Sequence, residues 1–259
     1  IWVGTQAGLN RFDPHSGQIT RYSVADLQTT TTDYVLGLYE DSTGDFWVSL
    51  WSGPLIKLDR TSGQVIKRYP AETDGFAAIV EDPDDPNILW IGSLVAGLAK
   101  FDKRTETFTF YHQDATIPTL GPSTGYLYSV IHDRDEEVLW LGGWYGGGLN
   151  RFDKKTGRFT HYVADPADLS SLSANVVTTI YQDSRGRVWA GTQGGGLNKF
   201  DKPTQTFTRY TAEQGIPSNV NVILEDESGM LWLGTDAGLL AFDPEKEAVT
   251  QRYDDSDNL

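Results

Sequence analysis

The sequence has no cysteine, few basic residues and no long apolar run. Because none of the 259 residues is cysteine, disulfides and thiol chemistry are excluded. The 21 basic residues are outnumbered by 36 acidic ones, and the resulting net charge of −15 opposes binding to nucleic acid or to an anionic membrane. No stretch approaches the roughly 18 apolar residues of a membrane-spanning helix. We therefore expect no nucleic-acid partner and no membrane contact by this segment.

What the chain does contain is six copies of one phrase. Each copy begins with a Trp-x-Gly motif or a near variant, continues with Gly-Leu-x-x-Phe-Asp or a close relative, and ends at a tyrosine. The motif tryptophans are 43 to 50 residues apart, at Trp2, Trp47, Trp90, Trp140, Trp189 and Trp232. Short β-type runs that repeat with this period, and no helical pattern, are typical of a β-propeller.

The fifth copy shows how one repeat forms one blade. Its β-branched run 175–181 predicts an innermost strand, and a tight turn follows at 183–186. Residues 187–191 and 197–201 predict the second and third strands, and 206–210 the outermost one. The other copies fit the same frame, with outermost strands that end at Tyr22, Tyr69, Tyr111, Tyr162, Tyr210 and Tyr253.

The frame predicts an all-β propeller of six four-stranded blades in one domain, 1–259, with 23 strands because the first blade lacks its inner strand. The expected blades span 1–22, 32–69, 73–111, 124–162, 174–210 and 218–253. Longer connections precede the fourth and fifth. Because the repeat is cut at both ends, we expect a piece of a longer propeller, with a closed six-bladed ring as the alternative.

Three phrases carry a family resemblance: Ser171-Leu-Ser-Ala-Asn-Val-Val, Trp189-Ala-Gly-Thr-Gln-Gly-Gly-Gly-Leu-Asn-Lys-Phe-Asp and Leu231-Trp-Leu-Gly-Thr-Asp-Ala-Gly-Leu. They resemble the two-component regulator propeller repeat, over essentially the whole chain. Such propellers commonly form the periplasmic sensor of hybrid histidine kinases and often respond to oligosaccharides. The resemblance implies a periplasmic or extracellular, non-enzymatic sensing module. Its implied partners are a small-molecule or oligosaccharide ligand and the other domains of a sensor protein.

Residues that differ between equivalent repeat positions are the candidates for a binding site. Trp51 and Trp144 each lie four residues after a repeat tryptophan, in the loop between the second and third strands, and Tyr145 lies beside Trp144. The equivalent loops of other blades offer Gln6, Gln193 and Asp236. Entries to the innermost strands, expected on the same axial face, offer Asp33, Tyr34, Asp74, Tyr126, Asn175 and Asn219.

Aromatic plates beside amide and carboxylate groups suit sugar recognition, because ring faces stack on C–H surfaces while the polar groups bind hydroxyls. We therefore expect a ligand-binding axial face. The alternatives are that Trp51 and Trp144 only pack their own loops, or that the face binds a protein, as in an adaptor propeller. The sequence also leaves a homodimer open. A third alternative is a propeller lyase resembling virginiamycin B lyases.

Catalysis has little support in the sequence. The four histidines fall in four different blades, and no pair has metal-ligand spacing. We expect no catalytic residue, no metal site and no cofactor. The acidic runs 82–85 and 133–137 lie at turns between innermost and second strands, and we expect them to be solvated.

Overall fold

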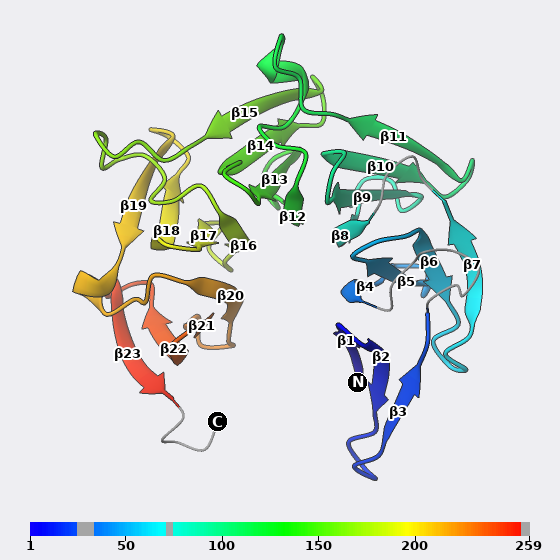
Figure 1. Ribbon diagram of the computed structural model, residues 1–259. Helices are drawn as coiled ribbons and strands as arrows, with labels where there is room; N and C mark the ends of the chain where they lie inside the picture. Colours follow the sequence, from blue (N-terminus) through cyan, green and yellow to red (C-terminus); the bar gives the residue numbers. More distant parts are fainter. Residues whose placement is uncertain (25–33, 71–74, 255–259) are drawn as a thin grey trace. The chain divides into compact units, whose positions relative to one another are not determined.

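The computed structural model describes residues 1–24, 34–70 and 75–254. They form 23 strands and two short 3-10 helices, arranged as six antiparallel sheets of consecutive strands (Figure 1). The fold is an all-β propeller of six blades whose first blade lacks its innermost strand, as predicted. Among these residues no helix has the length and apolar character needed to cross a membrane.

The chain divides into two compact units, of which the first comprises Ile1–His112 and Gly125–Val130. It contains three blades, one of three strands and two of four. Their strands are β1 (Trp2–Thr5), β2 (Gly8–Phe12) and β3 (Ile19–Tyr22); β4 (Val35–Glu40), β5 (Phe46–Leu50), β6 (Leu55–Leu58) and β7 (Val65–Tyr69); and β8 (Phe76–Glu81), β9 (Ile88–Ser93), β10 (Leu98–Asp102) and β11 (Thr107–Tyr111).

The second unit comprises Gln113–Thr124 and Ile131–Leu259. The fourth blade begins with β12 (Leu127–His132), whose first four residues belong to the first unit. The remaining strands are β13 (Val138–Gly143), β14 (Leu149–Asp153) and β15 (Arg158–Tyr162); β16 (Val177–Gln182), β17 (Val188–Thr192), β18 (Gly196–Asp201) and β19 (Thr206–Tyr210); and β20 (Val220–Glu225), β21 (Leu231–Thr235), β22 (Gly238–Asp243) and β23 (Ala248–Tyr253). The 3-10 helices are η1 (Pro118–Leu120) and η2 (Ala212–Gln214).

The predicted frame matches the strands closely, and every outermost strand ends at the expected tyrosine. The innermost strand of the fifth blade is an exception, because β16 begins at Val177 rather than at residue 175. A bulge interrupts its pairing with β17 between Val177 and Thr179. The predicted turn forms as expected, with Gly186 at a φ of 81° and its N–H bonded to the Asp183 carbonyl at 2.9 Å.

The repeat tryptophans pack between neighbouring blades within each unit. In three of them the indole of one blade lies edge-on to a phenylalanine of the next, with ring centroids about 5 to 6 Å apart, and these three tryptophans are almost fully buried. The pairs are Trp47–Phe101 at 5.8 Å, Trp140–Phe200 at 4.9 Å and Trp189–Phe242 at 5.7 Å. Each hydrophobic core therefore forms between blades, so a blade cannot bury its apolar faces alone.

The connection that enters a blade also covers the edge of that blade's outermost strand. In the fifth blade, Phe207 of β19 donates its N–H to the Ser170 carbonyl at 2.7 Å, and the Arg209 guanidinium bonds the Ser171 carbonyl at 2.8 Å. In the fourth blade, a His161 ring nitrogen lies 2.9 Å from the Gly121 carbonyl. The long connections that lengthen these repeats thus protect strand edges that could otherwise pair with another chain.

Candidate functional site

Each blade has two chemically different ends. Because neighbouring strands are antiparallel, the loop between the second and third strands lies at the same end as the segment that enters the innermost strand. We call this the loop end, and the opposite end, with the two remaining hairpin turns, the turn end. All the predicted ligand-binding residues that the structure describes belong to loop-end segments.

In the first unit, Tyr34 and Trp51 form one stacked aromatic surface. Their ring centroids are 5.6 Å apart and their planes differ by 10°. The Trp51 N–H donates to the Tyr34 carbonyl at 2.9 Å, which fixes the two backbones side by side. Trp51 is nevertheless 45% exposed. We call this pair the aromatic shelf. It brings together two of the predicted residues, with one ring face of Trp51 occupied by its neighbour.

Three further loop-end segments of the first unit are linked to the shelf by backbone contacts. Gly75 packs directly under Trp51, where a Cβ would lie 2.0 Å from the Trp51 carbonyl oxygen, and it accepts a hydrogen bond from Leu94 N–H at 3.3 Å. Beyond Leu94, Val95 is 51% exposed, and Tyr126 is 39% exposed. The predicted residue Tyr126 is therefore accessible on a segment linked to the shelf through neighbouring backbones.

In the second unit, the predicted amides mostly serve the backbone. The Asn175 side-chain oxygen accepts the Ala164 N–H at 2.6 Å, and the Asn219 oxygen accepts the Gly194 N–H at 2.9 Å. The Asn219 amide also donates to the Asp236 carboxylate at 2.9 Å. Asn175 holds its own entry connection and Asn219 ties its entry segment to two loops, so a structural role accounts for both. Their contacts cross 11 to 25 residues, a pairing that the sequence did not reveal.

Gln193 and Asp236 are exposed at the loop ends of the fifth and sixth blades. The fourth blade offers Trp144, which is half-buried, and Tyr145, which is 69% exposed. Tyr145 has a φ of 52°, in the left-handed region that a bulky residue seldom adopts. The structure thus gives the second unit a separate set of accessible polar and aromatic side chains.

The remaining predicted residues are Gln6, Asp33 and Asp74. Gln6 is exposed in the short loop of the first blade, next to Thr5, whose hydroxyl bonds the Gly8 carbonyl at 2.8 Å. Asp33 and Asp74 lie outside the described residues. Among the described residues, no group of three or more His, Cys, Asp or Glu side chains could hold a metal ion.

At the turn end, an aspartate holds each repeat tryptophan of blades two to six, an arrangement that sequence reasoning missed. The carboxylate accepts the indole N–H at 2.7 to 2.9 Å, in the pairs Asp41–Trp47, Asp82–Trp90, Asp133–Trp140, Asp183–Trp189 and Asp226–Trp232. A recurring Asp six to eight residues before each Trp was the available signal. The expectation of solvated acidic turns was wrong for Asp82 and Asp133, which are buried because they bind the indoles.

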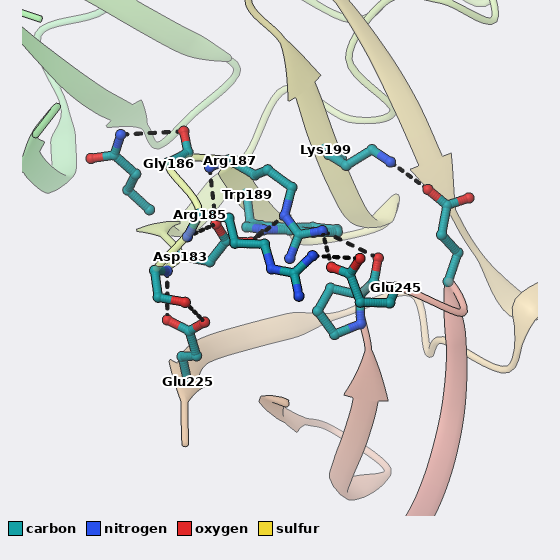
Figure 2. A network of polar contacts seen from close by, with 12 residues as sticks. Asp183, Arg185, Gly186, Arg187, Trp189, Lys199, Glu225 and Glu245 are labelled. Carbon is teal, nitrogen blue, oxygen red and sulfur yellow. Dashed lines mark hydrogen bonds and ion pairs between the residues drawn. The ribbon is translucent and has the colours of Figure 1, made fainter. Parts of the chain in front are cut away.

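Ionic contacts at the turn end also join one blade to the next. Lys103 of the third blade donates to Asp41 of the second at 2.7 Å. Figure 2 shows the contact between the fifth and sixth blades, where Arg187 reaches Glu245 at 2.6 Å. In the same network the Ser184 N–H donates to the Glu225 carboxylate at 2.7 Å. The side chains of the turn end therefore hold the tryptophans and join neighbouring blades.

The protein is thus a β-propeller with accessible aromatic and polar side chains at its loop ends. The model of the two-component regulator propeller family matches residues 171–194 and 214–237. These segments run from the entry connection through the second strand of the fifth and sixth blades, which are therefore two-component regulator propeller repeats. In these two blades the family match agrees with the resemblance predicted from the sequence.

Similar proteins are mostly much longer than this chain. Histidine kinase P4 of Formosa agariphila is 27% identical over 105 residues, which are 40% of this chain and 7% of that protein. The extracellular domain of BT3049 from B. thetaiotaomicron, assigned to a hybrid two-component system, has a TM-score of 0.71 at 24% identity, over 84% of this chain and 29% of that one. PorZ, a surface component of the type-IX secretion system of Porphyromonas gingivalis, has a TM-score of 0.70 at 20% identity, over 93% of this chain and 36% of that one. The structural likenesses show the propeller fold.

Proposed function

We propose that this chain is a non-enzymatic, ligand-sensing propeller that binds an oligosaccharide or another small ligand at its loop ends, as part of an extracytoplasmic signalling protein. The aromatic shelf carries the proposal. Trp51 is anchored through its backbone and stacked on Tyr34, yet almost half of it faces solvent. The extracellular two-component domain and the histidine kinase among the similar proteins support the sensing role.

The shelf has the chemistry of a sugar platform. The exposed part of the indole offers a flat apolar surface for the C–H face of a pyranose, and Tyr126, which is 39% exposed, adds a second aromatic ring near it. Because the Trp51–Tyr34 stack is already formed, little side-chain entropy remains to be lost on binding. A ligand that favours one arrangement of neighbouring domains would then transmit a signal through its differential affinity alone.

The test is a thermal-shift screen of oligosaccharides on wild type, Trp51→Ala and Ile66→Ala. Ile66 is an exposed apolar residue of the same blade, on the outermost strand and away from the loop end. A ligand at a hundred times its Kd stabilises the folded state by about 2.7 kcal/mol. We expect Trp51→Ala to weaken binding by about 2 kcal/mol, roughly 30-fold, and Ile66→Ala to leave it unchanged.

Two results would count against the proposal. One is that no sugar stabilises the wild type, which would favour a protein-binding role for the exposed aromatic residues. The other is that Trp51→Ala and Ile66→Ala bind equally well, which would move the site away from the shelf. Tyr145→Ala serves as an independent variant for the second unit.

A further inference from the structure

A cavity of about 120 Å³ lies at the turn end between the fourth and fifth blades, and the residues that line it all belong to the second unit. Three aromatic rings form part of its wall, those of Trp140, Tyr162 and Phe200. The polar side chains that complete the wall are those of Glu136, Arg151, Lys202 and Gln205. A cavity of roughly 150 Å³ can take one benzene molecule, so there is room here for a small ligand.

The same arrangement of rings and charge recurs between the fifth and sixth blades. In both places the third strand carries a cation directly across from the repeat tryptophan, and the tyrosine that ends the outermost strand lies edge-on to a phenylalanine of the next blade. The pairs are Arg151 with Trp140 and Tyr162 with Phe200 in one place, and Lys199 with Trp189 and Tyr210 with Phe242 in the other. The centroids of the tyrosine and phenylalanine rings are 4.9 Å apart in the first and 5.2 Å in the second. The two places can therefore be compared position by position.

One position in the turn between the third and outermost strands differs in charge. It has a left-handed backbone in both turns, with a φ of 57° at Gln205 and 52° at Glu247. The Glu247 carboxylate contacts Lys199 Nζ and accepts the Tyr210 hydroxyl at 2.7 Å. Gln205 has a neutral amide, and the Tyr162 hydroxyl lies 3.4 Å from its oxygen, beyond the ordinary O–H···O distance. The cavity thus lies where a glutamine replaces the carboxylate that completes the equivalent place.

The groups around the cavity can hold a carboxylate from outside the chain. Arg151 donates to the Glu136 carboxylate at 2.6 Å, one hydrogen bond of the five that a guanidinium can form. Burial raises the pKa of the Tyr162 hydroxyl, which therefore stays protonated and able to donate. Lys202 Nζ adds a second positive charge, although Asp133 lies 2.8 Å from it. Because the two cations already have acidic neighbours, a single negative charge fits better than the double charge of a phosphate.

We propose that this cavity binds a small monocarboxylate, whose carboxylate group takes the place that the Glu247 side chain fills between the fifth and sixth blades. The apolar part of the ligand lies against the aromatic rings, and its carboxylate receives charge-assisted hydrogen bonds. A bound ligand joins the fourth blade to the fifth as Glu247 joins the fifth to the sixth. This site lies at the turn end, apart from the loop ends, and goes beyond the proposed function.

The test is an NMR titration of the whole chain with benzoate, benzamide and phosphate. At about pH 7 benzoate is ionised and the two cations are charged. We expect benzoate to shift the backbone amide signals of residues 201–205 with a Kd of about 1 mM or tighter, and benzamide and phosphate to bind at least about tenfold more weakly. The equivalent turn 243–247 is the internal control, and its signals should not shift because Glu247 already supplies the carboxylate.

Two variants and a matched control locate the site. Gln205→Glu supplies the carboxylate from the chain itself and Arg151→Met removes the guanidinium, so each should weaken benzoate binding at least about tenfold. Gln251→Glu adds the same charge as Gln205→Glu on an exposed position of β23, away from the cavity, and should change the affinity less than about twofold.

Four results would overturn the proposal. The signals of residues 201–205 could stay unchanged up to about 20 mM benzoate, a concentration far above the expected Kd. Benzamide could bind as tightly as benzoate, or phosphate more tightly. Gln205→Glu and Gln251→Glu could have equal effects. Should Arg151→Met fail to fold, the comparison of the two glutamate variants still decides, and the sugar screen on the loop ends is independent of all four results.

Discussion

Replacing Asp41 tests whether the turn end holds neighbouring blades together. Its carboxylate is fully buried and accepts hydrogen bonds from Trp47 Nε1 at 2.8 Å and, across the blade boundary, from Lys103 Nζ at 2.7 Å. Asp41→Asn keeps the size of the side chain but removes its charge and one acceptor oxygen. Among the described residues, Lys103 then keeps Glu81 as its nearby carboxylate, at 3.6 Å.

The loss of unfolding free energy in Asp41→Asn can be worked out in two ways. Removing one partner of a buried ion pair typically costs about 3 to 5 kcal/mol. Here Glu81 partly compensates, so we expect about 3 kcal/mol of lost unfolding free energy. Burial alone would raise the pKa of Asp41, but hydrogen bonds from Lys103, Thr43 and Trp47 outweigh it and hold the pKa at about 2. The fall from the ordinary 3.8 corresponds to about 2.5 kcal/mol, in agreement.

The lowered pKa also fixes the sign of the pH dependence. Because the folded pKa lies below the unfolded one, the ionised carboxylate stabilises the fold above about pH 4, and this stabilisation is lost as the pH falls towards 2. Asp41→Asn should lack this part of the acid sensitivity. Its stability deficit should therefore be largest at neutral pH and should shrink in acid.

The assay is urea unfolding, followed by tryptophan fluorescence, of wild type, Asp41→Asn, Lys103→Met and the double variant. We expect a coupling free energy of at least about 1.5 kcal/mol, because both single changes break the same contact. As a control, Asp226→Asn should cost less, since Asp226 also binds an indole but forms no ion pair within the described residues. Single effects that add to within about 0.5 kcal/mol would refute the reasoning.

Two other changes test the loop ends. Gly75→Ala should lose more than about 2 kcal/mol of unfolding free energy, because its φ is 91° and the new Cβ would lie 2.0 Å from the Trp51 carbonyl oxygen. The control is Gly44→Ala, at a φ of 85° in open space. It should lose only about 1 kcal/mol in the same urea assay. Equal losses would show that the close approach relaxes freely. Arg209→Met removes the bonds to four carbonyls of the connection 163–176, so the amide protons of this connection should exchange at least about tenfold faster while β17 stays protected. Uniform acceleration would point to global destabilisation instead.

The strand frame could be read from the sequence because it rests on local regularities. Alternating side chains, turn residues and a fixed repeat period define the strands, and the tyrosine that ends each outermost strand marks the boundary without any tertiary information. The same regularities separated Trp51 and Trp144 from the repeat tryptophans. Their place in the loops between the second and third strands follows from the frame alone.

The partners of side chains were decided only by the tertiary structure, because they depend on which backbones the folded chain brings together. The sequence could not show that Asn175 binds the entry connection at Ala164, that Asn219 binds the loop at Gly194, or that Lys103 reaches Asp41 62 residues away. Nor could it show that Tyr34 stacks on Trp51, which requires two loop-end segments to lie side by side. A repeat period determines the blades, whereas hydrogen bonds and ring contacts between distant segments determine how the candidate side chains are held at the loop ends.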